Sequence, residues 1–151
     1  MSNKRTNDRI TISVDAMGGD AGPASVVAGM AVSASITPEI AFLIHGPKSE
    51  LEPLVEKRRE LSEIVTYVDV DDVVTMEDKP SQVMRHGKGT SMWSAIEAVR
   101  DGKAQATVSC GNTGALMALS MLRLRRLPGI GRPAIAILWP SRNPQGFNVM
   151  L

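Results

Sequence analysis

The stretch Ile10–Asp20, ITISVDAMGGD, alternates apolar and polar residues over its first five positions and then turns through the adjacent glycines Gly18 and Gly19. The alternation predicts a half-buried β-strand, and the glycines predict a tight turn after it. Pro23 then lies where a helix can begin, and small apolar residues follow through about Ile36. This stretch therefore predicts a strand–turn–helix unit.

Similar units recur along the chain. Apolar strands are predicted at 41–45, 64–68 and 106–110, with two further candidates at 133–138 and 147–151. Helices are predicted at 51–61, about 92–99 and 115–126, the last apolar nearly all round and so expected to be buried. Residues 79–91 are interpreted as a polar connection, with Thr90 or Ser91 capping the next helix. Strand–helix units in series predict an α/β fold, a mostly parallel sheet covered by helices on both faces.

Composition and charge exclude several classes of protein. The 151 residues carry 17 Lys and Arg against 16 Asp and Glu, a formal charge of +1, so no global field favours nucleic acid. With 3% aromatic residues the chain lacks a base-stacking surface. Cys110 is the single cysteine, which rules out an internal disulfide and a cysteine zinc site. We find no leader or spanning segment and expect a cytoplasmic protein.

The two ends of the chain differ in character. Residues 1–8 are polar, and we expect a flexible tail there. The last residues, 148–151, lie inside a predicted strand, without a turn or a cap after them. We therefore expect residues 9–151 to be the N-terminal part of a single α/β catalytic domain that continues beyond residue 151.

The first turn is a candidate anion site. Its glycines would let backbone N–H groups approach a ligand ahead of a helix N-terminus. Gly18 and Gly19 are adjacent and the next glycine is Gly22, so the turn does not match the G-x-G-x-x-G dinucleotide pattern. An ordinary strand-to-helix turn explains the spacing equally well. Asp15 and Asp20 would repel phosphate unless a Lys, an Arg or a metal offsets their charge. The alternative is that they cap the helix or orient cationic neighbours.

The second turn, Ser109–Gly114, indicates an anion site more strongly than the first turn does. Backbone donors at a helix start are joined there by two hydroxyls and the Asn112 amide, a set that suits a phosphate oxygen or a tetrahedral oxyanion. An ordinary capped turn is the alternative. Cys110 has no base in its segment, so we interpret it as a small buried hydrophobic residue rather than a nucleophile.

A third polar cluster consists of Lys79–Ser81 and residues 85–91. Its Gly-Lys-Gly-Thr sequence departs from a P-loop, because Lys88 is followed by glycine and Gln82 stands where the first P-loop glycine belongs. The cluster would close over phosphate groups, or it is a solvated loop. Arg132, before a predicted strand, is likewise open to either interpretation.

Four motifs occur here in a shared order, and together they resemble one family. They are Val14–Asp20, Lys79–Ser81, Ser109–Ala118, and Leu127–Ile130 with Arg132–Ala134. The chain is similar over about residues 9–151 to the bacterial phosphate acyltransferases of phospholipid synthesis, the PlsX family.

The resemblance implies a three-layer αβα Rossmann-like fold related to isocitrate dehydrogenases and phosphate acetyltransferases. It implies transfer of a fatty acyl group from acyl carrier protein to inorganic phosphate, giving acyl-phosphate for phosphatidic acid synthesis. No cofactor is implied, because the substrate carries its own phosphopantetheine. The implied partners are a second copy of the chain, acyl carrier protein, the downstream acyltransferase and the inner face of the membrane, contacted peripherally.

The resemblance also suggests roles for individual residues. Asn112 and Lys79 become catalytic candidates, and no metal ligand is implied. Phosphate-binding candidates are Gly18, Gly19, Asp20, Ser81, Lys88, Ser109, Gly111, Thr113, Gly114 and Arg132.

Three alternatives stay open at this point. One is a short-chain phosphate acyltransferase that uses acyl-CoA, because these residues do not distinguish an acyl-CoA donor from acyl carrier protein. A dehydrogenase relative is disfavoured, since no nucleotide fingerprint is present. The third is a phosphate-binding module or an inert fragment, and we expect residues 1–151 alone to be inactive.

Overall fold

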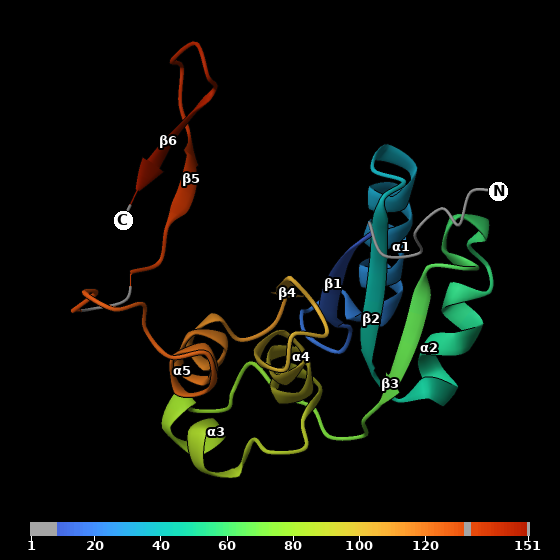
Figure 1. The fold of residues 1–151 in the computed structure, drawn as a ribbon, viewed down its shortest axis with the longest axis horizontal. Coiled ribbons are helices and arrows are strands. Elements are labelled where there is room, and N and C mark those ends of the chain that lie inside the picture. The colour runs from blue at the N-terminus through green and yellow to red at the C-terminus, as the bar shows by residue number, and fades with distance from the viewer. Residues whose placement is uncertain (1–8, 132–133, 151) are drawn as a thin grey trace, which may run out of the picture.

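The computed structural model describes residues 9–131 and 134–150, so the tail predicted for residues 1–8 lies outside the described residues. Its centre is a four-stranded parallel sheet with strand order β3-β2-β1-β4 (Figure 1). This confirms the parallel sheet predicted from the sequence. The strands are β1 (Ile10–Asp15), β2 (Ile40–Gly46), β3 (Val65–Asp69) and β4 (Ala106–Ser109).

Strand β1 lies inside the sheet and its side chains alternate between the two faces. It pairs with β2 on one side and β4 on the other, so that Asp15 lies opposite both His45 and Ser109. Val14 is buried in the core below one face, whereas Ser13 and Asp15 are buried against the other. One side of β1 thus contributes to the apolar core, and the other side forms polar contacts with α4 and the residues at its start.

The apolar face is covered by α1 (Gly22–Ile36), α2 (Lys48–Val55) and the 3₁₀ helix η1 (Arg59–Leu61). The single helix predicted at 51–61 is therefore wrong, because the chain becomes extended at Arg58 and divides it in two. Asp20 does not cap α1, whose N-cap is Ala21 without a side-chain hydrogen bond.

The other face is covered by α4 (Ser91–Arg100), with α3 (Pro80–His86) and α5 (Thr113–Arg123) packed beyond it. Thr90 is the N-cap of α4 and accepts a hydrogen bond from the Trp93 N–H at 3.3 Å. Helix α3 falls within the segment expected to be a loop. The expectation failed because Val83 is its only buried residue, which leaves no apolar periodicity to detect.

Helix α5 is less buried than its composition predicted. Ala115 and Leu119 are fully buried against α3 and α4, whereas Met117, Met121 and Leu122 are exposed. The prediction of burial all round is wrong for the described chain, because α5 forms the outer surface there.

The last two strands, β5 (Ile137–Pro140) and β6 (Phe147–Met150), do not join the parallel sheet. They pair with each other as an antiparallel hairpin, which Figure 1 shows standing away from the four-stranded sheet. The remaining elements form two helical layers around one sheet, the three-layer α/β architecture expected. Within residues 9–131 and 134–150, no helix combines the length and apolar character needed to cross a membrane.

Candidate functional site

The site expected from the sequence lies at the carboxyl ends of β1 and β4, where the chain leaves the sheet towards opposite faces. After β1 the chain passes to α1 on one face, and after β4 it passes to α5 on the α4 side. Neighbouring parallel strands whose connections diverge leave a crevice at their carboxyl ends, which is where open α/β sheets bind ligands. The Gly18–Gly19 turn follows β1 and the Cys110–Gly114 turn follows β4, so both lie at these carboxyl ends.

The two glycine turns touch each other through their backbones. A Cβ added to Gly18 would lie 2.7 Å from the Gly111 nitrogen and 2.9 Å from its Cα, closer than real Cβ atoms come. Gly19 has φ +101°, and a Cβ there would lie 3.0 Å from the Cys110 Cβ. Glycine is therefore required for steric reasons at Gly18 and for backbone conformation at Gly19. We call these contacting turns the glycine corner.

The buried carboxylate of Asp15 ties the glycine corner to the start of α4. Its Oδ1 accepts a hydrogen bond from the Ser91 hydroxyl at 2.7 Å, and its Oδ2 accepts one from the Ser109 hydroxyl at 2.7 Å. The Met17 N–H also donates to Oδ1, at 3.3 Å, and the Gly111 N–H donates to the Ser109 oxygen at 3.1 Å. One carboxylate thus fixes three segments around the crevice.

Both ends of the Asn112 side-chain amide form hydrogen bonds with backbone groups of the protein. Its Oδ1 accepts a hydrogen bond from the Ala115 N–H at 3.0 Å and so caps α5. Its Nδ2 donates to the carbonyls of Thr75, Met76 and Asp78 at 3.2, 3.3 and 2.9 Å. The amide therefore holds the 75–78 turn against the start of α5, and its catalytic role stays a prediction.

The 75–78 turn leads directly to the Lys79–Ser81 motif. Lys79 is the exposed N-cap residue of α3, and Ser81 is exposed in its first turn. A Cβ on Gly114 would lie 2.9 Å from the Pro80 ring, so the starts of α3 and α5 are in contact. The structure thus brings Lys79 and Ser81 beside Thr113 and Gly114, although no hydrogen bond of the described residues tests their predicted roles.

The remaining candidates lie further from this contact or outside the described residues. Lys88 is exposed in the turn between α3 and α4, three residues before Ser91. Asp20 is exposed beside the glycine corner. Arg132 lies outside the described residues. Among those described, no group of three or more His, Cys, Asp and Glu side chains is arranged to hold a metal ion.

Cys110 is exposed, so the expectation that it is buried is wrong. Its side chain lines a groove on the α1 face of the sheet together with Val108. The His45 ring contacts Ser94 of α4 and therefore faces the opposite side. This separation leaves His45 unable to act as a base for the Cys110 thiol.

His45 belongs to a buried polar seam between the sheet and α4. Its Nε2 and Nδ1 lie 2.8 Å from the hydroxyl oxygens of Ser13 and Ser94. Because the Ser13 hydroxyl donates to the Ala95 carbonyl at 2.9 Å, we assign the imidazole proton to Nε2. Burial and, to a smaller extent, the nearby charge of Lys103 together lower the pKa of His45 from 6.5 to about 4. The ring is neutral at physiological pH and acts structurally.

The sequence profile of the fatty acid synthesis protein family matches residues 10–151. The chain belongs to this family. This membership confirms the family resemblance that the four motifs indicated.

Relatives in this family carry a more specific name. A phosphate acyltransferase of Ruegeria sp. (strain TM1040) is 76% identical over 143 residues, which make up 95% of this chain and 38% of the relative. The phosphate acyltransferase of Paracoccus denitrificans (strain Pd 1222) is 68% identical over 144 residues, 95% of this chain and 39% of the relative. The chain thus spans about two fifths of the length of these relatives.

Sequence reasoning missed two members of the site. Asp15 was recognised as a carboxylate beside the turn, but not as the acceptor that joins the turns. Ser91 was considered as a helix cap and as part of the polar cluster at residues 85–91, whereas its hydroxyl donates to Asp15 across 76 residues of sequence. A polar residue at the buried end of a strand is the one signal that could have indicated such a contact.

Proposed function

We propose that the protein containing this chain transfers a fatty acyl group from acyl carrier protein to inorganic phosphate. The contact between the two glycine turns at the divergence of β1 and β4 is the observation that carries the proposal. The names of the family and of its relatives support acyl chemistry and phosphate as acceptor. Acyl-phosphate made this way would feed phosphatidic acid synthesis.

Phosphate would bind at the start of α5. Ala115 and Leu116 N–H groups already have acceptors on Asn112, whereas those of Thr113 and Gly114 precede them in the first turn, where an α-helix supplies no internal acceptor. Free N–H groups and the helix dipole favour an anion. Lys79, at the adjoining start of α3, would offset the phosphate charge.

In the proposed reaction a phosphate oxygen attacks the thioester carbonyl carbon. A C–O bond forms, the C–S bond breaks, and the proton of hydrogen phosphate ends on the phosphopantetheine thiol. The thiolate leaves readily, so positioning of phosphate against the carbonyl supplies much of the rate. The phosphopantetheine belongs to the substrate, and the proposal needs no separate cofactor.

Acyl carrier protein is acidic, and exposed basic residues near the site would receive it. Arg85 and Lys88 are exposed on α3 and after it, and Arg125 and Arg126 are exposed after α5. Arg123 is less available, because it pairs with Glu97 and lies 4.8 Å from the Trp93 ring centre. We propose this surface for the carrier. A homodimer and peripheral contact with the inner membrane and the downstream acyltransferase complete the proposal.

A donor comparison with the full-length protein tests the proposed function. Hexadecanoyl-acyl carrier protein and hexadecanoyl-CoA are each supplied with labelled phosphate, and acyl-phosphate is trapped with hydroxylamine. We expect thiol release that requires phosphate and matches acyl-phosphate formed, with the carrier protein as the better donor. Faster turnover of the CoA thioester would instead favour the acyl-CoA alternative, and phosphate-independent thiol release would contradict acyl transfer to phosphate.

A further inference from the structure

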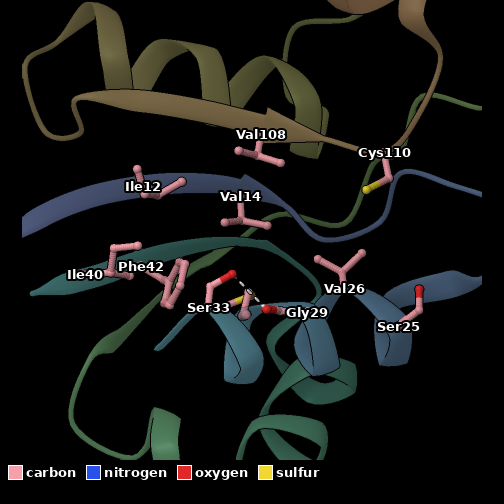
Figure 2. A pocket seen from close by; sticks show the side chains of 11 residues that line it. Ile12, Val14, Ser25, Val26, Gly29, Ser33, Ile40, Phe42, Val108 and Cys110 are labelled. Atoms are coloured by element: carbon pink, nitrogen blue, oxygen red, sulfur yellow. Dashed lines mark hydrogen bonds between the residues drawn. The ribbon is translucent and has the colours of Figure 1, made fainter. Parts of the chain in front are cut away.

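An apolar groove begins at the glycine corner and runs along the α1 face of the sheet (Figure 2). Its volume is about 420 Å³, within the range of small-molecule sites. Ile12, Val14 and Phe42 form its floor on the sheet, and Val26 and Met30 belong to the α1 wall. Of the described residues, those lining the groove include no charged side chain.

The groove is a direct consequence of the diverging connections. Helix α1 packs over β2 and towards α2 and η1, while the chain after β4 passes to the opposite face. No described helix therefore covers β4 on this side, and Val108 is 47% exposed there. An exposed apolar side chain beside a cavity of this size is typical of a ligand site.

One end of the groove meets the proposed phosphate site. Cys110 lines the groove, and its Cβ lies 3.0 Å from where a Cβ of Gly19 would be. Ser25 lies at the same end in Figure 2, whereas Ile40 and Phe42 lie towards the other. This end of the groove, which we call the polar mouth, carries the Ser25 hydroxyl and the Cys110 thiol. Further along, the one other polar side chain of the lining is Ser33, whose hydroxyl donates to the Gly29 carbonyl at 3.0 Å, and the rest of the lining is apolar.

We propose that this groove holds the hydrocarbon chain of the acyl substrate while its carbonyl lies at the glycine corner. The inference rests on the proposed function for the position of the carbonyl. An amphiphile with a polar head and an unbranched apolar tail matches the polar mouth and the uncharged interior. Burial of each methylene group would strengthen binding about fourfold, so the groove makes the enzyme selective for long chains.

Gly29 offers a test that preserves the fold. It lies on the groove wall, has space around the position of a Cβ, and sits inside α1, where leucine is a better helix former than glycine. In the full-length protein, Gly29→Leu would occupy the groove. Ser35→Leu is the matched control, because Ser35 is exposed on α1 and does not line the groove.

The readout is kcat/KM for hexadecanoyl and butanoyl thioesters of acyl carrier protein. We expect Gly29→Leu to lower the hexadecanoyl value by about tenfold or more, the effect of displacing two methylene groups, and the butanoyl value by less than about twofold. Ser35→Leu should match wild type on both. Equal loss on both thioesters with a lowered Tm would show that another part of the protein fills the groove, and unchanged values would also overturn the inference.

A second measurement does not depend on turnover. A hexadecanoyl thioester with a photoreactive diazirine in mid-chain should label residues of β1, α1 and β4 that line the groove, and Gly29→Leu should reduce this labelling. Labelling elsewhere overturns the inference. If wild type forms no acyl-phosphate yet is labelled in the groove, the proposed reaction fails while acyl binding stands.

Discussion

His45 shows at the scale of one residue how burial sets a pH dependence. Its pKa is about 4 in the folded protein and near 6.5 in an unfolded chain, so the unfolded state binds a proton first as the pH falls. The contribution to stability is complete above pH 6.5 and is lost between pH 6.5 and about 4. The shift corresponds to about 3 kcal/mol.

We expect the stability difference between wild type and His45→Gln to narrow as the pH falls through that window. Tm values of the full-length proteins at several pH values measure it. His86→Gln is the matched control, because His86 is the other histidine and is exposed on α3. A difference that stays constant from pH 7.5 to 4 would show that His45 does not titrate as proposed.

The Asn112 side-chain amide could contribute to activity in two ways, by contacting the substrate or by holding neighbouring backbone segments in place. We expect Asn112→Ala to lower kcat/KM for phosphate by about 10²-fold, because the start of α5 and the 75–78 turn lose the amide that joins them, and misplacement of a binding group by 1 Å has an effect of that size. Because three carbonyls also lose their donor, segment 75–78 should exchange its amide hydrogens faster. Hydrogen-exchange mass spectrometry measures this, and unchanged exchange with lost activity would indicate that the amide contacts phosphate directly.

At the scale of elements, the close approach of two strand ends is the feature that makes the site. The β1–β4 pairing places Asp15 opposite Ser109, and the turns that follow meet with no room for a side chain at Gly18. Whatever separates these turns should also displace the start of α5 from the crevice.

We therefore expect Gly18→Ala to reduce kcat/KM for phosphate by about 10²-fold, because misplacement of a binding group by 1 Å has an effect of that size. Steady-state kinetics of the full-length enzyme check it. Gly131→Ala is the control, since a Cβ there meets open space. Wild-type kinetics in Gly18→Ala would remove the glycine corner from the site.

At the scale of the whole molecule, apolar surface is left uncovered on α5 and on the β5–β6 hairpin. Met121 and Leu122 on α5 and Leu138, Trp139 and Val149 on the hairpin are all exposed. Exposed apolar side chains in such number mark an interface or promote aggregation. The chain spans about two fifths of the length of its relatives.

We expect residues 1–151, produced alone, to self-associate and to show no turnover, whereas the full-length protein is active. Size-exclusion chromatography and the phosphate-dependent assay measure the two properties. A stable monomer with acyl transfer activity would contradict this expectation.

The predictions from sequence were most reliable for regular, local features. Four parallel strands and helices α1, α4 and α5 follow from apolar periodicity and from turn residues. Helix α3 was not predicted, because a single buried valine cannot produce the apolar periodicity that indicates a helix. Strands β5 and β6 were predicted only as separate strands, because the local sequence does not indicate which strands pair.

The sequence by itself determined the four strands of the parallel sheet, helices α1, α4 and α5, and the places where the backbone must turn, because apolar patterning and glycine conformation act within a few residues. The tertiary structure alone decided that Asp15 joins Ser91 and Ser109, that the Asn112 amide faces carbonyls, and that Cys110 opens onto a groove. These contacts join residues 34 to 94 positions apart or depend on which helix covers which face. The order of the strands in the sheet determines which of these residues meet, and that order results from packing of the whole chain.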